Sequence, residues 1–349
     1  MVLETFLPLV IETLTFFSIY LICSSSLNLQ QGYTGISNLG LFFSISSGAY
    51  VIAALPTRLA VWLYGIDMDF VYQNALVVSL LNEKFAKDAF TPTILLVITF
   101  FAAMAVGWSL GYAFTYLSLR LTETYLAVFF LCVAEAIKIF GENFIPLAGG
   151  PNGILLPNFF IWLGNYSWIV QSIFFIVIPF IIFAVYEKIA GSPFGRLLKA
   201  IRENELALQC LGRNTVSFKL KVMAFTSAFL AVTGVLVSLR MRSVVAGTFD
   251  RVDYSFWPWL MMMLGGAGNN IGCLVGTFLC IIIRRIVYWL KFYLVFLPVD
   301  IMWLEYILLG LAFMLVMIYK PEGILPEKVH KLKSLNESDH KKVVEQVRL

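Results

Sequence analysis

Long apolar blocks, separated by short polar connections, run along almost the whole chain. Several of them approach or exceed the ~20 apolar residues that a helix needs to cross a bilayer. The block at 255–264 is too short to cross alone, whereas the block at 92–119 is long enough to tilt. The blocks lie near 5–29, 39–64, 92–119, 121–140, 158–186, 222–239, 255–264, 271–290 and 294–319.

This pattern predicts an all-α polytopic membrane protein with about 8–10 transmembrane helices, some of them broken or re-entrant. A β-barrel would instead show residues of alternating character in short strands. The composition agrees, because 60% of the 349 residues are hydrophobic and 13% are charged, whereas an average soluble domain is about a quarter charged. The chain is therefore interpreted as one transmembrane domain over 1–328, followed by a polar tail over 329–349.

The first segment, "MVLETFLPLVIETL", carries Glu4 and Glu12 and no basic residue before its apolar run. We therefore expect a retained span rather than a cleaved signal peptide. The five cysteines form no close pair, so a disulfide framework is not expected. They are interpreted as core or lipid-facing residues.

The distribution of charge predicts the orientation. The segment 187–221 is rich in Lys and Arg, as is the tail, and short basic loops stay in the cytoplasm. The segment 56–91 carries balanced charges and 141–157 is nearly uncharged, so both fit the outside. Three arginines fall outside in this scheme, where Asp250 and Asp253 lie near enough in sequence to offset them. The arginines are Arg240, Arg242 and Arg251.

Between residue 250 outside and residue 320 inside, the chain needs an odd number of crossings. A re-entrant pair over 255–283 followed by one full span satisfies this requirement. Three crossings, the first very short, satisfy it equally. The sequence leaves both arrangements open.

Two glycine-rich breaks interrupt the apolar blocks, "GYTGISNLG" at 32–40 and "LGGAGNNIG" at 264–272. Irregular backbone is costly in hydrocarbon and persists where it lines a cavity or packs against protein. One break in each half of a transporter is also the arrangement expected of an internal repeat. The predicted solute-path residues are Gly32, Thr34, Gly35, Ser37, Asn38, Gly40, Gly265, Gly266, Gly268, Asn269 and Asn270.

The alternative interpretation is that these small residues only let helices approach closely. For Gly107 and Gly111 close packing is the favoured reading. For the two breaks a path is favoured, because the neighbouring Asn and Ser side chains need hydrogen-bond partners.

The segment "SPFGRLLKAIRENELALQCLGRN", 192–214, is amphipathic and charged. Ser192 and Pro193 suit the cap and first turn of a helix, and Gly212 suits its end. A surface helix with a free apolar face requires a partner or the headgroup layer, so we expect a helix that docks on a partner. Its apolar stripe consists of Leu197, Leu198, Ile201, Leu206 and Leu208.

Charged residues within apolar blocks are functional candidates by default. Glu135 and Lys138 lie three residues apart and are interpreted as a structural ion pair or an interface anchor. Glu305 lies near the outer end of the last span. The sequence lacks an H-E-x-x-H motif, a Cys and His cluster and a Ser-His-Asp arrangement, so no catalytic residue, no metal site and no enzymatic activity are expected. Four tryptophans are expected at the membrane interface, namely Trp257, Trp259, Trp289 and Trp303.

Four stretches of the chain resemble one known family. They are "LNLQQGYTGISNLGLFFSISSGAYVIAAL" at 27–55, "LRLTETYLAVFFLCVAEAIK" with "GGPNGI" at 119–154, the segment 192–214, and "LGGAGNNIGCLVGTF" with "KPEGILPEK" at 264–328. Their order and spacing are similar to those of the permease subunits of ABC importers for branched-chain amino acids, in particular the second, M-type subunit.

This resemblance implies a subunit that works with a second permease subunit, two cytoplasmic ATPase subunits and an extracytoplasmic solute-binding protein in a prokaryotic cell membrane. It implies that the partner ATPase, and not this chain, uses ATP. In agreement, no "GxxxxGK[ST]" loop is present, and no nucleic-acid partner is expected. The implied coupling residues are Arg202, Glu205, Ala207, Gly212 and Arg213.

The chain departs from the family pattern at Gly40, which Leu41 follows where the family usually has His. Its two histidines, His330 and His340, are in the tail. The resemblance therefore leaves the solute open among branched-chain amino acids, urea, short amides and other small polar solutes. The alternative function is an ion-coupled secondary transporter, which would need intramembrane carboxylates that face the path.

Overall fold

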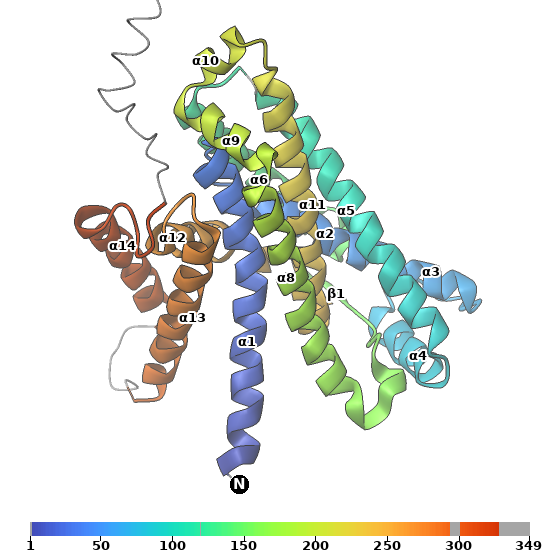
Figure 1. The fold of residues 1–349 in the computed structure, drawn as a ribbon. Coiled ribbons are helices and arrows are strands. Elements are labelled where there is room, and N and C mark those ends of the chain that lie inside the picture. The colour runs from blue at the N-terminus through green and yellow to red at the C-terminus, as the bar shows by residue number, and fades with distance from the viewer. Residues whose placement is uncertain (1, 119, 294–300, 328–349) are drawn as a thin grey trace, which may run out of the picture.

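The computed structural model describes residues 2–118, 120–293 and 301–327. The predicted tail, 329–349, lies outside this part of the chain. Helices account for nearly all of the regular structure in the described residues. Figure 1 shows a fan of long helices, with α9 and α10 together at one end and α3 and α4 near the other. We call these the α9 end and the far end.

The first half of the chain enters on α1 and returns through short and long helices. A π-helical segment, η1, continues α1 up to the first glycine break. The helices are α1 (Val2–Leu27), η1 (Asn28–Tyr33), α2 (Phe42–Ala54), α3 (Pro56–Leu63), α4 (Asn74–Lys87), α5 (Phe90–Ser118) and α6 (Glu123–Asn143).

A connection at the far end leads into the second half. It contains α7 (Ile145–Ala148), η2 (Gly150–Asn152), β1 (Ile154–Leu155) and η3 (Ile161–Tyr166), and β1 pairs antiparallel with β2 (Ser243–Val244). The remaining elements are α8 (Ser167–Gly191), α9 (Pro193–Glu203), α10 (Glu205–Cys210), α11 (Thr215–Met241), η4 (Ala246–Thr248), η5 (Val252–Phe256), α12 (Trp257–Gly265), α13 (Asn270–Tyr293) and α14 (Ile301–Tyr319).

Within the described residues, 6 helices are long and apolar enough to cross a membrane, and the 305–319 part of α14 adds a shorter apolar helix. The apolar helices α2 and α12 are shorter than a full bilayer span. The prediction of an all-α polytopic membrane protein with some short or broken segments is therefore confirmed.

The last three helices run back and forth between the far end and the α9 end. Near the far end, Arg284 of α13 pairs with Asp253 of η5 and lies 2.5 Å from Glu305 of α14. Near the α9 end, the backbone N–H of Leu325, just after α14, donates to the Gly265 carbonyl at 3.0 Å. Successive segments therefore run antiparallel, which both a re-entrant pair and three crossings with a very short first one require, so the number of crossings stays a prediction.

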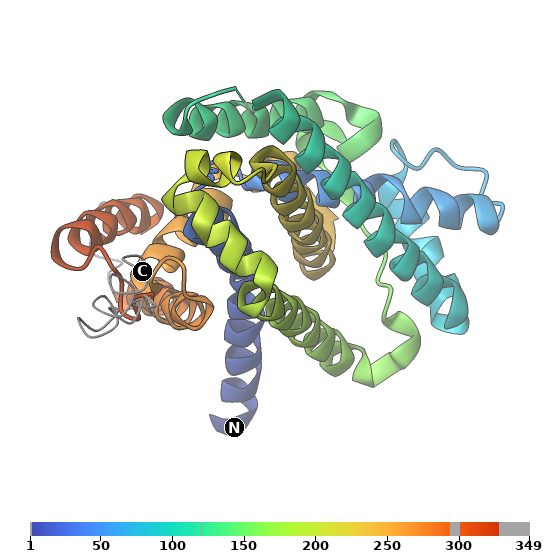
Figure 2. The same cartoon turned by 45° about the horizontal axis from the view of Figure 1, so that its top comes forward.

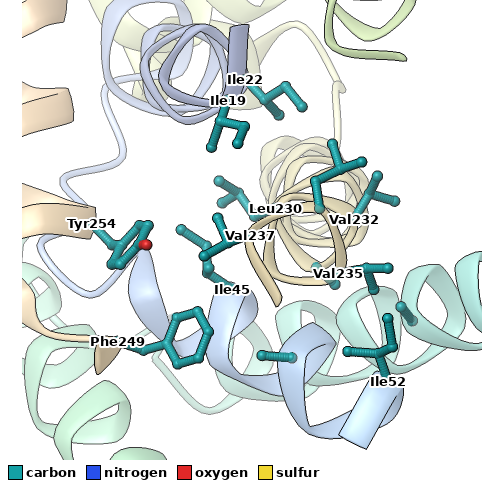
Figure 3. Packing of buried hydrophobic residues seen from close by; sticks show 14 of the residues in the cluster. Ile19, Ile22, Ile45, Ile52, Leu230, Val232, Val235, Val237, Phe249 and Tyr254 are labelled. Carbon is teal, nitrogen blue, oxygen red and sulfur yellow. The ribbon is translucent and has the colours of Figure 1, made fainter. Parts of the chain in front are cut away.

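Helix α11 forms the centre of the fold. In its spanning window, 89% of the residues are buried, against 17% in that of α8. It packs most extensively against α5 and α2, and Figure 3 shows α11 end-on between α1 and α2. A Cβ atom at Gly107 or Gly111 of α5 would overlap atoms of Ser227 of α11. The prediction that these two glycines permit close packing is confirmed.

The helix contacts follow a repeated pattern. Helix α11 packs on α2 and α5, and α1 packs on α12 and α13. Helices α1 and α11 are antiparallel, because Glu12 pairs with Arg240 at 3.1 Å and Gln30 donates to Thr226 at 2.7 Å. These contacts support an internal repeat of inverted direction. The two glycine breaks are not equivalent within it, since one precedes α2 and the other follows α12.

Several charged residues have partners other than those expected. Glu135 pairs with Arg251 at 3.4 Å rather than with Lys138, and Glu12 rather than an aspartate offsets Arg240. The five cysteines are free, as expected.

Two of the four tryptophans contact the interior of the chain, and their place relative to the membrane interface stays a prediction. Trp257 is buried, and Trp259 donates from its ring N–H to the Asn38 carbonyl at 2.9 Å. The side chains of Trp289 and Trp303 lie outside the described part.

Close contact of α2 with α11 predicts a destabilised Gly48→Leu variant. A Cβ at Gly48 would overlap the carbonyl of Ala231, so the two helices have to separate, at a cost of about 1–3 kcal/mol. Thermal unfolding of the protein in detergent measures this loss. The matched control is Gly310→Leu, because a Cβ at Gly310 meets nothing within 4 Å. Equal melting temperatures for the two variants would contradict the packing described here.

Candidate functional site

The first glycine break is an unwound segment between η1 and α2. Gly35 has a φ of +76°, a conformation that favours glycine. Asn38 is fully buried, donates to Gln30 Oε1 at 3.0 Å and accepts from the Gly40 N–H at 2.9 Å. Ser37 donates to Gln31 Oε1 at 2.9 Å. The polar side chains of the break therefore find their partners within or beside it.

The second break, between α12 and α13, turns at Gly266 and Gly268, which have φ values of +118° and +81°. Asn269 starts α13, because its Oδ1 accepts from the N–H groups of Ile271 and Gly272 at 3.1 and 3.3 Å. The loop after α14 lies against this break, and Asn269 Nδ2 donates to the Leu325 carbonyl at 3.2 Å.

The two breaks meet at Asn28, a fully buried residue of η1. Asn28 Oδ1 accepts from the Gly268 N–H, and Asn28 Nδ2 donates to Asn270 Oδ1, both at 2.8 Å. A Cβ at Gly32 would overlap both Gly268 N and the Asn28 side chain. Asn270 in turn donates to Glu187 Oε2 of α8 at 2.8 Å. Glycine at position 32 is therefore required for the two breaks to touch.

Helix α9 reaches the same meeting point with two cations. Arg202 donates to the Gly32 carbonyl of the first break, and Lys199 Nζ donates to the Gly268 carbonyl of the second at 3.4 Å. Both cations also pair with Glu327, each at 2.6 Å. We call Lys199, Arg202 and Glu327 the Glu327 bridge. It ties one surface helix to both breaks and to the loop after α14.

The charge state of the bridge is favourable at neutral pH. Burial raises the pKa of Glu327, but hydrogen bonds from Lys199 and Arg202 outweigh this effect and hold the pKa below its ordinary value. Glu327 therefore stays ionised, and its contribution is lost only as the pH falls through that lowered pKa.

A cavity of about 420 Å³ opens beside the first break at the α9 end. Thr34 and Gly35 line it, together with Arg202, Glu205 and residues of α5, α6 and α11. Glu205 pairs with Lys219 across it at 2.6 Å. We call it the inner cavity. It brings predicted path residues and predicted coupling residues to one place.

Several other predicted path residues do not line the inner cavity. Asn38 and Gly40 pack inside the chain, and a Cβ at Gly40 would overlap the backbone of Phe130. Gly265 faces Gly272 across the α12–α13 turn, where a Cβ would overlap the Gly272 carbonyl. A direct contact of these positions with solute stays a prediction.

The coupling segment forms two short helices rather than one. Ser192 accepts from the Gly195 N–H at 3.4 Å and caps α9, as expected, and Asn204 caps α10 by accepting from the Ala207 N–H at 3.0 Å. Gly212 ends the segment with a φ of +75°. This is the left-handed conformation that glycine commonly adopts just after a helix.

The expected free apolar stripe is divided between the two helices. Leu198 and Ile201 of α9 are buried in the core of the chain, so they are not free to dock on a partner. Leu206 and Leu211 are 72% and 77% exposed. Among the implied coupling residues, Arg202 and Glu205 line the inner cavity, whereas Ala207, Gly212 and Arg213 are exposed.

Asn28 and Glu327 were not predicted from the sequence as site residues. For Asn28 the sequence did contain a signal. A spacing of four residues, which places side chains on one helix face, joins Glu12, Phe16, Tyr20, Ser24, Asn28 and Gly32. For Glu327 no local pattern existed, since its two partners lie more than a hundred positions earlier in the chain.

The central position of Asn28 predicts a destabilised Asn28→Leu variant. Leucine leaves the Gly268 N–H and Asn270 Oδ1 without their partner in a buried site, and we expect a loss of about 1–2 kcal/mol in unfolding free energy. Thermal unfolding in detergent measures it. The control is Asn143→Leu, because Asn143 is exposed and donates only to Ile139 of its own helix. A melting temperature for Asn28→Leu as high as the control's would show that this bond does not hold the breaks together.

A family model described as "Branched-chain amino acid transport system / permease component" matches residues 9–317. The probable branched-chain amino acid transport permease protein LivM of Methanocaldococcus jannaschii is 33% identical over 326 residues, covering 92% of this chain and 94% of the relative. The high-affinity LivM permease protein of Escherichia coli is 25% identical over 351 residues, covering 93% and 72%. No solved structure matches the chain. The chain therefore belongs to the family of permease components of branched-chain amino acid transport systems.

Proposed function

We propose that this chain is a membrane-spanning subunit of an ATP-driven importer in a prokaryotic cell membrane. In this proposal it forms part of the path for branched-chain amino acids or similar small polar solutes together with a second permease subunit. An extracytoplasmic solute-binding protein delivers the solute at the far end. Separate ATPase subunits bind at the α9 end and hydrolyse the ATP.

One observation carries this proposal: a single surface helix, α9, contacts both glycine breaks through Arg202 and Lys199. A partner that displaces α10 and α9 would pull on the two places where irregular backbone lies in the membrane. The relatives named as branched-chain amino acid permeases support the solute class. The exposed Leu206 and Leu211 support a protein partner at this end.

The alternative of an ion-coupled transporter has weaker support. Such a mechanism requires a carboxylate that is free to take up and release an ion within the membrane. Glu12, Glu135 and Glu305 each lie in an ion pair with an arginine. Each of these carboxylates therefore already has a cationic partner within the chain, so we favour the ATP-driven mechanism.

Docking of an ATPase on the exposed leucines predicts that the double variant Leu206→Asp, Leu211→Asp no longer assembles. Carboxylates at these positions place charge in an apolar contact, which opposes burial. Purification in mild detergent, with quantification of the ATPase that co-elutes, measures assembly. The control is Leu155→Asp, because Leu155 is 48% exposed at the far end. An unchanged amount of ATPase with the double variant would refute docking at this surface.

The Glu327 bridge predicts a coupling defect in Glu327→Gln. Loss of the carboxylate weakens the hold of α9 on the loop after α14, and we expect the number of solute molecules taken up per ATP hydrolysed to fall about fivefold or more. The assembled complex in proteoliposomes provides both rates. Glu322→Gln is the matched control, because Glu322 is an exposed residue of the same loop. Normal uptake per ATP in Glu327→Gln would exclude this route of coupling.

A further inference from the structure

A cavity of about 360 Å³ lies at the far end, where the beginnings of α1 and α8 meet the end of α11. Helix α1 packs against both of the other helices, and Figure 1 shows α1 and α8 side by side. We call this space the Arg242 cavity. Its volume is within the range of small-molecule sites, which begins at roughly 300 Å³.

The Arg242 cavity lies at the level of the lipid headgroups. The spanning segment of α1 begins at Pro8, and that of α11 ends at Met241. Arg240 and Arg242 flank this end of α11, and Trp168 in the first turn of α8 is 46% exposed. Tryptophan is enriched at this level of a bilayer. A ligand in the cavity therefore meets polar headgroups on one side and hydrocarbon on the other.

The charges around the cavity do not balance. Glu12 supplies the carboxylate of the lining, and two arginines share it: Arg240 lies 3.1 Å from Oε1 and Arg285 lies 2.8 Å from Oε2. Arg242, in contrast, makes no ion pair and no side-chain hydrogen bond with another residue that the structure describes. Three guanidinium groups thus lie near one carboxylate, an excess of two positive charges. Charge of one sign around a cleft with apolar walls attracts an ion of the opposite sign.

The backbone at Arg242 has a conformation that favours glycine. Its φ and ψ are +52° and +24°, at the residue that ends α11. Among the described residues it is the one non-glycine with a positive φ. Glycine is the usual residue at such a helix end, because a Cβ is strained there. An arginine in this place points to a use of its side chain beyond ending the helix.

One side of the cavity is apolar and continues into the lipid-facing surface of α8. Ile11 of α1 and Phe175 of α8 belong to the lining. In the spanning window of α8 only 17% of the residues are buried. A spacing of four residues places exposed apolar side chains on one face of this helix, where an acyl chain can lie. They are Ile169, Ile173, Val177 and Ile181.

These features fit a phospholipid better than a soluble anion. Arginine binds phosphate oxygens through two parallel N–H donors, and an acyl chain covers the apolar side that a soluble anion leaves empty. A headgroup with a net negative charge offsets the excess of positive charge. A zwitterionic headgroup brings an additional cation to the same place.

We propose that the Arg242 cavity binds an anionic phospholipid from the leaflet at the far end, with its phosphate on Arg242 and Arg240 and one acyl chain along α8. The lipid lies beside Glu12, whose ion pairs join α1 to α11 and α13. The proposal concerns a structural lipid and not the transported solute, so it does not depend on the proposed function.

The test measures lipid binding to the complete chain, purified in mild detergent with the subunits that co-elute. Native mass spectrometry gives the apparent dissociation constants of phosphatidylglycerol and of phosphatidylcholine with the same acyl chains. We expect phosphatidylglycerol to bind about fivefold or more tightly, because its headgroup carries a net negative charge. Inorganic phosphate at the same concentration should not displace it.

Two substitutions at one position separate the side chain from the backbone. Arg242→Gly suits a φ of +52°, so it should unfold at the same temperature as the wild type or a higher one when no lipid is added. It should nevertheless bind phosphatidylglycerol about fivefold more weakly or worse, because a charged hydrogen bond is lost. Arg242→Lys keeps the charge and should retain most of the preference for phosphatidylglycerol.

The matched control is Arg251→Gln. Arg251 is also an arginine near the far end, but it pairs with Glu135 and is not part of the lining. Its loss should leave phosphatidylglycerol binding unchanged, and an equal loss of binding in this control would show a general effect of charge and overturn the proposal.

Three further results would overturn it. They are equal affinities for the two lipids, wild-type affinity for phosphatidylglycerol in Arg242→Gly, and displacement of the lipid by inorganic phosphate, which would indicate a site for a free anion. None of these results involves the ATPase or the transported solute.

Discussion

The structure depends on one constraint, which is that irregular backbone in a membrane has to find its hydrogen-bond partners inside the protein. The two glycine breaks meet this constraint through bonds within each break and through Asn28 of η1. Asn28 bonds both the Gly268 N–H and the Asn270 side chain, and the loop after α14 bonds the carbonyl of Gly265. Segments from the beginning, the end and the last third of the chain are therefore fixed at one point. That point lies beside α9, the surface helix whose two cations reach it.

The core of the fold and the α9 end are held by different kinds of contact. The α2–α5–α11 core packs backbone against backbone, because Gly48, Gly107 and Gly111 leave no room for a side chain. Figure 2 shows α9 and α10 beside this core rather than within it. The contact of α9 with the breaks consists of a few charge-assisted bonds around a single carboxylate, Glu327. A few such bonds can rearrange without unpacking the core, so the α9 end is the part of the molecule suited to transmit a movement.

A row of polar pairs lies along the interface of α1 and η1 with α13. Glu12, Tyr20 and Ser24 of α1 and Asn28 of η1, which are separated by multiples of four residues, each meet a polar residue of α13. A polar group in hydrocarbon needs a partner, and partners on a facing helix fix the register of the two helices. The same pairs are spaced along this interface from Glu12 to Asn28, at the α9 end.

The sequence by itself determined the class of the protein, the approximate position of most spans, the caps at Ser192 and Gly212, and the two breaks. Each of these depends on local composition, helix length or the φ angle of a single residue, so a window of sequence is sufficient. The tertiary structure decided that the breaks touch, that Glu327 joins two cations of α9, that Glu135 pairs with Arg251, and that Leu198 and Ile201 face inward while Leu206 and Leu211 face outward. It also buried Trp257 and brought the ring N–H of Trp259 to the Asn38 carbonyl. These features depend on which helices become neighbours. Packing and the pairing of buried polar groups decide this, and they join residues up to hundreds of positions apart. A local sequence pattern does not contain that information.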